Sequence, residues 1–313
     1  MITYLKKLHY SSYKISYNEL ILELSEAYIR NCSIGLAYGV SNTDGKTEES
    51  QVLKILDYAR NNGINTLDTA GGYGDSEQVI GKLINKYKWN VITKTPNFSG
   101  KKIGEDQLRL MNVSFNESLN KLGSIDTLLV HSANDLLKSG GNRIFAEINK
   151  LKELDLINKV GVSVYTYKQI DYILENYKVD IIQLPISILD QRLIKSGHLK
   201  KIKKYGIEIH ARSVFMQGLL LMPLHNLPSY FDKVYNNIDE FIAYASKYSM
   251  SNLELALGFV QSLDEVDKVI VGVNTIDQLH EIIEASEVRV NCEKYSNISV
   301  SDASYVDPSN WKL

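Results

Sequence analysis

The feature that most constrains the fold of this chain is a regular alternation of short apolar runs with longer segments of helical periodicity. The runs are rich in Val, Ile and Leu, as expected of strands buried on both faces. The intervening segments, such as 48–62 and 105–123, space apolar residues as amphipathic helices do. The predicted strands lie at 64–70, 90–96, 125–132, 159–165, 180–187, 207–215 and 268–273, with a weaker first strand near 29–36.

Alternation of this kind favours one α/β domain with a parallel sheet. Eight repeats fit within the 313 residues, and no Pro-, Gly- or Ser-rich linker divides them, so we predict a closed (β/α)8 TIM barrel that forms a single domain over 1–313. Residues 1–28 are expected to be an irregular N-terminal extension and 286–313 a C-terminal tail. The alternative is an open doubly wound sheet. Such a sheet would be expected to carry a Gly-x-Gly-x-x-Gly turn, which the sequence does not contain.

Composition narrows the class of partner and the compartment. The formal net charge is −2, without the basic excess typical of nucleic-acid binding, so a small molecule is the expected partner. Cys32 and Cys292 are too far apart to indicate a disulfide framework or a zinc motif, which favours the reducing cytoplasm. No signal-peptide pattern or membrane-spanning apolar run is recognised, so no membrane association is expected.

Polar residues that end the apolar runs are the candidate catalytic groups, because the active site of such a barrel lies at the carboxyl ends of its strands. Asp68 follows the apolar stretch INTL within the run at 64–70, and Tyr73 follows five residues later. Lys94 follows NVIT and His131 follows DTLLV in the next two runs. Each residue alone would more often be a cap, a loop aromatic, a solvated strand end or a core histidine. Together, on neighbouring strands, they predict one catalytic mouth.

The ionisation of these four groups suggests a reaction. An ammonium group beside a phenol favours the phenolate, so Lys94 is expected to lower the pKa of Tyr73. Asp68 is placed to offset the charge of Lys94. His131 is expected to donate a hydrogen bond to a substrate carbonyl oxygen, where it would share the developing negative charge with Tyr73. This set suits proton-coupled hydride transfer to a carbonyl group and requires no metal.

The stretch LDTAGGYGDSEQVIGK at 67–82, followed by TKTP at 93–96 and LLVHS at 128–132, resembles the aldo-keto reductases in order, spacing and strand context. The resemblance covers roughly residues 29–290. It implies that Asp68, Tyr73, Lys94 and His131 are the catalytic tetrad of the family and that Tyr73 is the general acid.

The resemblance also implies a nicotinamide cofactor and a set of residues that would hold it. Ser163 and Gln183 would contact the carboxamide, and Arg212 falls where many members stack a Tyr on the nicotinamide. The pyrophosphate would lie on the loop after the seventh strand. The expected cofactor-binding residues are Ser163, Gln183, Arg212, Ser213, Gln217, Gly218, Gly272, Asn274 and Gln278.

The segment at 272–282 resembles the part of the family that binds the adenosine end of the cofactor. NADPH is the expected cofactor. NADH is the alternative, because Gly272 and Gln278 stand at positions where NADPH-specific members often carry basic residues. In the segment at 29–39, Gly35, Tyr38 and Gly39 fit the first strand of the family. Arg30 and Asn31 would lie under the nicotinamide, where their bulk would weaken cofactor binding.

Three functional hypotheses follow. The first is an NAD(P)(H)-dependent oxidoreductase that reduces an aldehyde or ketone. A sugar-derived carbonyl is one candidate, since 35–49, 212–220 and 307–311 resemble a bacterial branch associated with sugar and surface-polysaccharide biosynthesis. The second is a weakly active or inactive cofactor-binding barrel that acts as a sensor or partner subunit. The third is a lyase or isomerase in which Lys94 forms a Schiff base.

Overall fold

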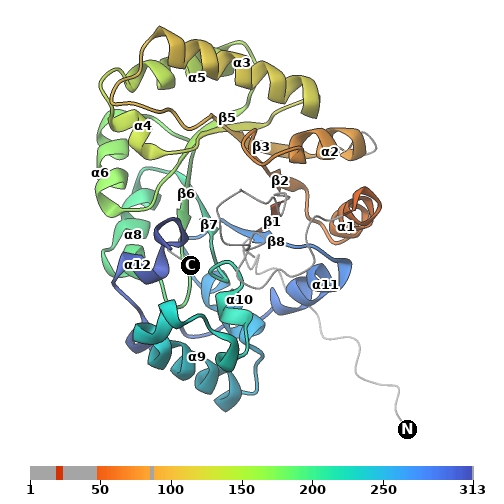
Figure 1. The fold of residues 1–313 in the computed structure, drawn as a ribbon, viewed down its shortest axis with the longest axis vertical. Helices are drawn as coiled ribbons and strands as arrows, with labels where there is room; N and C mark the ends of the chain where they lie inside the picture. Colours follow the sequence, from red (N-terminus) through yellow and green to blue (C-terminus); the bar gives the residue numbers. More distant parts are fainter. Residues whose placement is uncertain (1–18, 24–47, 85–87, 312–313) are drawn as a thin grey trace, which may run out of the picture.

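The computed structural model describes residues 19–23, 48–84 and 88–311. Parallel strands close a barrel in sequence order, β1 to β8, around which the helices form an outer ring (Figure 1). This confirms the predicted TIM barrel. The strands are β1 (Glu19–Glu23), β2 (Thr66–Asp68), β3 (Asn90–Lys94), β4 (Thr127–Val130), β5 (Lys159–Ser163), β6 (Ile181–Pro185), β7 (Glu208–Arg212) and β8 (Lys268–Gly272).

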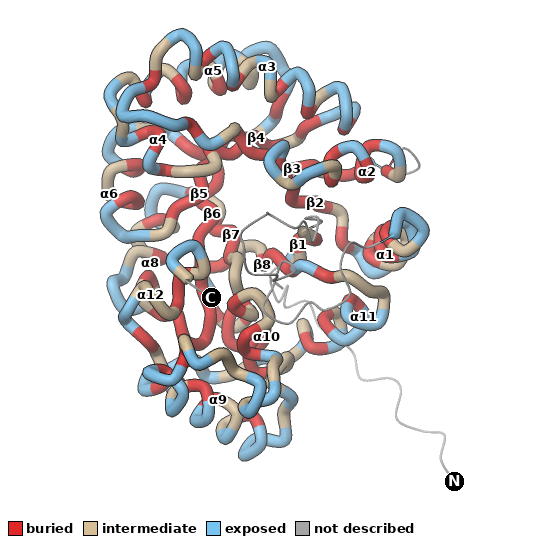
Figure 2. Tube along the Cα trace, viewed as in Figure 1, coloured by how far each residue is buried: buried red, intermediate tan, exposed pale blue. Residues whose placement is uncertain are grey.

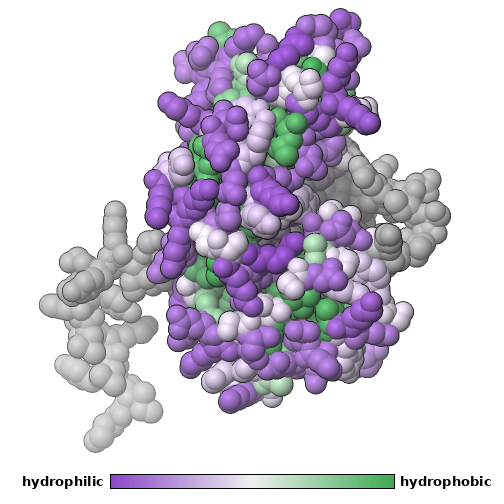
Figure 3. All heavy atoms as spheres, turned by 90° about the vertical axis from the view of Figure 1, so that its left-hand side faces the viewer, coloured by the Kyte–Doolittle hydropathy of each residue, from purple (hydrophilic) through white to green (hydrophobic). Residues whose placement is uncertain are grey.

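The outer ring covers the barrel with amphipathic helices. Their buried positions face the strands and their outer sides are exposed (Figure 2). The face shown in Figure 3 is largely hydrophilic, with its apolar side chains in small separate groups. In the described ranges, every helix is too short or too polar to cross a lipid bilayer. The α-helices are α1 (Glu49–Asn61), α2 (Ser76–Leu83), α3 (Glu105–Leu122), α4 (Ala133–Leu137), α5 (Asn142–Glu153), α6 (Tyr167–Asn176), α7 (Arg192–Lys195), α8 (His198–Lys204), α9 (Tyr235–Lys247), α10 (Asn252–Gln261), α11 (Ile276–Ala285) and α12 (Ala303–Val306).

The first strand corrects the sequence prediction. β1 pairs along its whole length with β8, from Glu19 opposite Lys268 to Glu23 opposite Gly272, and its end also pairs with β2. In the structure, 19–23 close the barrel as its first strand; the segment near 29–36, where the first strand was expected, lies outside the described residues. Residues 19–23 therefore belong to the barrel rather than to an irregular extension. The run ELILE gives only a weak strand signal, because just three apolar residues separate its two charged ends.

Alternate residues of each strand point into the barrel, and the others point toward the helices. Inside the barrel, one layer of aliphatic side chains forms a cluster separate from the main core; its members are Ile21, Ile92, Leu129, Ile181 and Ile270. Two positions after each of these residues, toward the carboxyl end of the strand, the next inward-facing position follows. The residues at these next positions are Glu23, Lys94, His131, Gln183 and Gly272. The strand register therefore gathers them above an apolar floor.

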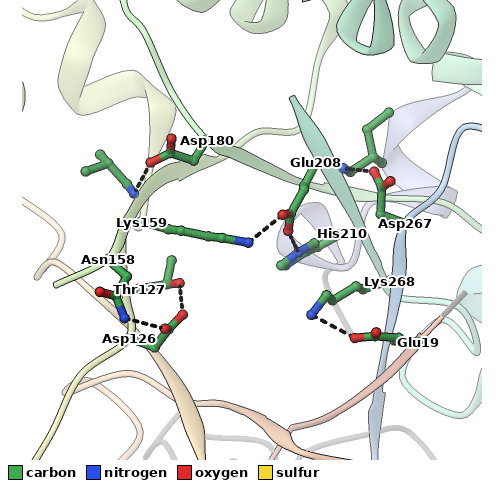
Figure 4. Close-up of polar contacts among 12 residues, drawn as sticks. Glu19, Asp126, Thr127, Asn158, Lys159, Asp180, Glu208, His210, Asp267 and Lys268 are labelled. Carbon is green, nitrogen blue, oxygen red and sulfur yellow. Dashed lines mark hydrogen bonds and ion pairs between the residues drawn. The ribbon is translucent and has the colours of Figure 1, made fainter. Parts of the chain in front are cut away.

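Below that floor, ion pairs close the opposite end of the barrel (Figure 4). Lys159 pairs with Glu208, and Lys268 Nζ lies 3.0 Å from a carboxylate oxygen of Glu19. His210 Nε2 lies 3.4 Å from the other oxygen of Glu208. Burial lowers the pKa of His210, so its imidazole is neutral at neutral pH. These charges are satisfied by one another, which leaves the carboxyl-end mouth as the candidate site.

The segment expected to be a tail, from 286, contributes short helical turns that pack on the barrel. They are η5 (Cys292–Ile298), α12 and η6 (Pro308–Asn310). The amide of Val300 donates to the carbonyl of Leu189, in the connection after β6, at 2.8 Å. The ring of Trp311 meets Phe231 edge-on, with centroids 5.0 Å apart. Phe231 lies in η4 (Ser229–Val234), after β7, so this segment packs on connections at the mouth end of the barrel.

Candidate active site

A buried ion pair lies at the centre of the mouth. Asp68 ends β2 and Lys94 ends β3; both side chains are about 2% exposed, and the Lys94 ammonium donates to Asp68 Oδ1. Lys94 Nζ also donates to the carbonyl oxygen of Thr69 at 2.8 Å. An ammonium group buried this far requires such partners, because desolvation of an unpaired charge is costly. The predicted association of Asp68 with Lys94 is therefore present.

Gln183 completes the anchoring of Asp68. Its Nε2 donates to Asp68 Oδ2 at 2.9 Å, so each oxygen of the carboxylate accepts one hydrogen bond. Gln183 was expected to bind the carboxamide of a cofactor. In the structure its amide nitrogen holds Asp68 instead, while its carbonyl oxygen remains the group that would accept from a carboxamide.

Tyr73 and His131 lie over this pair. Tyr73 is in the loop between β2 and α2, and Lys94 Nζ is 5.1 Å from the centroid of its ring. His131 directly follows β4 and meets Tyr73 edge-on, with ring centroids 6.1 Å apart and an interplanar angle of 86°. The backbone amide of His131 donates to the hydroxyl of Thr95 at 3.2 Å. The four residues of the predicted tetrad therefore converge.

Burial and neighbouring charges set the protonation of the two rings. Burial and the charge of Lys94 lower the pKa of His131 to about 4, so its imidazole is neutral at neutral pH. The pKa of Tyr73 is raised well above its usual value by burial and by the negative charges of Glu23 and Asp68. The net shift is therefore opposite to the lowering expected from Lys94. Asp68 neutralises the ammonium, and burial then disfavours the phenolate.

Glu23 is a site residue that the sequence interpretation missed. It ends β1, lies opposite Asp68 of β2 in the strand register, and its carboxyl group is hydrogen-bonded to the Tyr73 hydroxyl. A recognisable signal was present, because LILE is an apolar run that ends in a charged residue, as the runs ending in Asp68 and Lys94 are.

The residues expected to hold the nicotinamide surround the same mouth. Ser163 ends β5, is 3% exposed and lies opposite Gln183 of β6. Arg212 ends β7, and its guanidinium carbon lies 4.1 Å from the centroid of the Tyr165 ring. Its nitrogens donate to the carbonyl oxygen of Val164 at 3.3 Å and to the hydroxyl of Ser213 at 3.3 Å. Arg212 therefore stacks on an aromatic ring at the position where the family resemblance implied a stacked Tyr.

The loop after β7 has an unusual backbone. Ser213, Gln217 and Gly218 all have positive φ, at 61°, 54° and 87°, and Met216 between them has φ 49°. Left-handed conformations of non-glycine residues cost free energy and cluster at functional sites. Successive residues in right- and left-handed conformations also turn their amides toward one concave surface, which suits an anion. This loop therefore fits the role expected of it, binding a pyrophosphate.

At the end of β8, Gly272 is exposed and the chain continues into α11. Gln278 Oε1 accepts from the amide of Asn274 at 2.8 Å, and the Thr275 hydroxyl caps the helix by accepting from the Gln278 amide. Gln278 thus orders the turn that was expected to meet the adenosine end. Arg30, Asn31, Gly35, Tyr38 and Gly39, also expected near the cofactor, lie outside the described residues.

The donor set at the mouth fits a nicotinamide dinucleotide. A buried hydroxyl and an amide, from Ser163 and Gln183, are present for the carboxamide. A strained loop with amides for the pyrophosphate follows β7, and a capped helix N-terminus follows β8. These groups lie at the ends of consecutive strands β5 to β8, while the tetrad comes from β2 to β4 and the loop after β2. A cofactor and a carbonyl group would thus meet between two sets of residues.

Comparison with known proteins agrees with this arrangement. Residues 35–302 match the model of the aldo/keto reductase family. The uncharacterized oxidoreductase YqkF of Bacillus subtilis is 25% identical over 264 residues, covering 78% of this chain and 84% of the relative. The NADH-specific methylglyoxal reductase of Escherichia coli is also 25% identical over 264 residues, covering 73% of this chain and 80% of the relative.

Solved structures share the fold. The holo form of the aldo-keto reductase AKR11C1 of Bacillus halodurans superposes with a TM-score of 0.66 at 23% identity, over 80% of this chain and 87% of that one. The glycerol dehydrogenase AKR11B4 of Gluconobacter oxydans superposes with a TM-score of 0.63 at 22% identity, over 83% and 86%. With its closed barrel and the match to the family model, this chain belongs to the aldo/keto reductase family of NAD(P)H-dependent oxidoreductases.

Proposed function

We propose that this protein reduces an aldehyde or ketone with a nicotinamide cofactor, and that Tyr73 is the general acid. One observation carries the proposal: the buried Lys94–Asp68 pair lies beneath the Tyr73 ring, and a neutral His131 meets the edge of the same ring. A carbonyl oxygen placed between Tyr73 and His131 would meet two groups able to stabilise its developing negative charge.

The protonation states of the site support reduction. Because the pKa of Tyr73 is raised, its hydroxyl keeps its proton at neutral pH and holds it ready for the carbonyl oxygen. Neutral His131 has one ring N–H that it can donate to the same oxygen. Lys94 stabilises the phenolate that forms when Tyr73 gives up its proton, and Asp68 keeps Lys94 in place. A reduced nicotinamide, when bound, would supply the hydride for the carbonyl carbon.

For the cofactor, we propose that Ser163 and Gln183 hold the carboxamide, that Arg212 packs against the nicotinamide, and that Ser213, Gln217 and Gly218 bind the pyrophosphate. Gly272, Asn274 and Gln278 would meet the adenosine end. Residues 272–278 contain no cation to pair with a 2′-phosphate, and Asp277 is acidic. NADH should therefore bind at least as well as NADPH, which agrees with the NADH specificity for which the Escherichia coli relative is named.

For the substrate, we propose a small polar carbonyl compound. The mouth contains carboxylate, ammonium, guanidinium and amide groups from Glu23, Lys94, Arg212 and Gln183, which suit hydroxyl-bearing molecules better than apolar ones. The relatives include proteins named for methylglyoxal and glycerol. A sugar-derived carbonyl belongs to the same class and agrees with the resemblance of 212–220 and 307–311 to the branch associated with sugar and surface-polysaccharide biosynthesis.

The test begins with titration of the protein with NADH and, separately, with NADPH; binding is measured by the quenching of intrinsic fluorescence. A panel of small hydroxylated carbonyl compounds is then screened as substrates. Tyr73→Phe removes the proton that the mechanism transfers, so kcat should fall by about 10²–10⁴-fold while cofactor binding is kept. Tyr205→Phe, at an exposed ring, is the matched control and should leave kcat unchanged. Unchanged turnover in Tyr73→Phe would contradict the acid role. Cofactor binding without reduction of any carbonyl would favour a sensor.

A further inference from the structure

The end of β1 brings a fifth titratable side chain to the tetrad. Glu23 lies opposite Asp68 of β2 and opposite Gly272 of β8, two residues beyond Ile21 in the apolar floor. Its side chain therefore points into the mouth rather than toward the helices. There its carboxyl group is hydrogen-bonded to the hydroxyl of Tyr73, the group proposed to give its proton to the substrate.

The charges that face Glu23 come from several strands. Asp68 of β2 repels its carboxylate, whereas Lys94 of β3 and Arg212 of β7 attract it. β8 presents Gly272 at this level, and its charged residue, Lys268, pairs with Glu19 at the opposite end of the barrel. Lys94 is already held by Asp68 and by the Thr69 carbonyl. The hydrogen-bonding partner that acts on Glu23 is the Tyr73 hydroxyl.

We propose that Glu23 is a positioning residue that directs the Tyr73 proton and replaces it after each reduction. This inference rests on the function proposed above. When Glu23 carries a proton, its O–H donates to the Tyr73 oxygen, and the Tyr73 hydrogen is directed to the substrate. When Glu23 is ionised, it accepts the Tyr73 hydrogen and withdraws it from the substrate.

The proton transfers balance. In the reduction, a C–H bond forms at the carbonyl carbon with the hydride of the reduced nicotinamide, and the carbonyl oxygen takes the proton of Tyr73. The Tyr73 O–H bond that breaks is formed again with the proton of Glu23. The carboxylate of Glu23 then takes a proton from water at the mouth, so that one hydride and one solvent proton are consumed in each turnover.

Burial of the carboxyl group and the charge of Asp68 raise the pKa of Glu23 from its usual 4.5 to about 7. The change between the two states of Glu23 therefore falls near neutral pH. Reduction should be fast on the acidic side of this pKa and should decline on the alkaline side, where the carboxylate holds the Tyr73 hydrogen.

The first test compares kcat/KM for carbonyl reduction across pH in the wild type and in Glu23→Gln. We expect the wild-type value to fall by about tenfold per pH unit above about pH 7, because the protonated fraction of Glu23 falls in that proportion. The amide of Gln cannot ionise and still donates to Tyr73, so the variant should lose this decline. Glu19→Gln, at the other end of β1, is the control and should keep the wild-type profile. A decline near pH 7 that persists in Glu23→Gln would overturn the proposal.

The second test needs neither cofactor nor turnover. With ¹³C-labelled glutamate carboxyl groups, the resonance of Glu23 is identified by its loss in Glu23→Gln and is titrated by NMR. A midpoint near 7 is expected, and Tyr73→Phe should move it upward, because the hydrogen bond from Tyr73 lowers this pKa. A midpoint near the usual 4.5, or no effect of Tyr73→Phe, would overturn the proposal. Should no carbonyl be reduced, the proposed function fails, but this titration still decides the role of Glu23.

Discussion

Asp68 accepts a hydrogen bond on each of its carboxylate oxygens, from Lys94 and from Gln183. The carboxylate of Asp68 thereby offsets the ammonium charge of Lys94, which weakens the effect of that charge on Tyr73, whose ring centroid lies 5.1 Å away. Burial, and after it the negative charges of Glu23 and Asp68, then raise the pKa of the phenol, which keeps its proton. A sequence gives the residue types at the mouth, but the balance of such charges depends on distances and hydrogen bonds that only the fold determines.

Arg212 offers a test at the same scale. Its guanidinium lies over the Tyr165 ring, and this planar stacking is a property that Lys does not share. In Arg212→Lys we expect the Kd for NADH to rise by about tenfold, although the charge is kept. Fluorescence titration measures the change. Arg143→Lys, at an exposed pair with Glu105, is the control; an unchanged Kd in Arg212→Lys would show that its plane does not contribute to cofactor binding.

Helix α2 connects the Tyr73 loop to the rest of the barrel. Glu77 of α2 is buried and accepts hydrogen bonds from Thr93 of β3 at 2.7 Å and from Ser118 of α3 at 2.9 Å. One turn later, Gly81 packs directly on α3, because a Cβ there would lie 1.7 Å from the carbonyl oxygen of Lys121. The loop that bears Tyr73 is therefore held by a close helix–helix contact that only glycine permits.

Gly81→Ala should accordingly destabilise the protein. The added methyl group would force α2 and α3 apart, at a cost of about 1–3 kcal/mol in the free energy of unfolding. Denaturant unfolding measures this change. Gly72→Ala, in the Tyr73 loop, is the control, since a Cβ at Gly72 meets no atom within 4 Å. Equal stabilities of the two variants would mean that α2 shifts at no cost to accommodate the methyl group.

At this scale the sequence predicted most of the barrel. β2 to β8 lie within the expected runs, because strands buried on both faces must be continuously apolar. β1 was missed for the opposite reason: its inward-facing ends are charged, Glu19 toward Lys268 and Glu23 toward the mouth. The charged residue that made the strand hard to recognise, Glu23, is also the one that contributes to the mouth. The packing of the C-terminal segment on η4 had no periodic signal that could have revealed it.

For the molecule as a whole, two mouth residues affect stability in opposite directions as pH changes. The pKa of Glu23 is raised to about 7 in the fold, so its contribution to stability is complete below its usual value of 4.5 and is lost as pH rises to 7. The pKa of His131 is lowered to about 4 in the fold. Unfolded His131 therefore binds a proton between pH 4 and 6.5 that the folded ring does not, and stability rises with pH over that range.

These two contributions overlap between about pH 4.5 and 6.5 and largely cancel there, because the two pKa shifts are opposite in sign and similar in size, about 3 kcal/mol each. Glu23→Gln removes one of them. We expect the variant and the wild type to have the same Tm at about pH 4, and the variant to be more stable by a few degrees at about pH 8. Its Tm should also rise more steeply than that of the wild type between these values, because the effect of His131 is no longer offset. Thermal unfolding followed by circular dichroism measures both curves. Parallel curves would show that the carboxylate of Glu23 is not penalised by the fold, and would remove the physical basis for a proton held at this position.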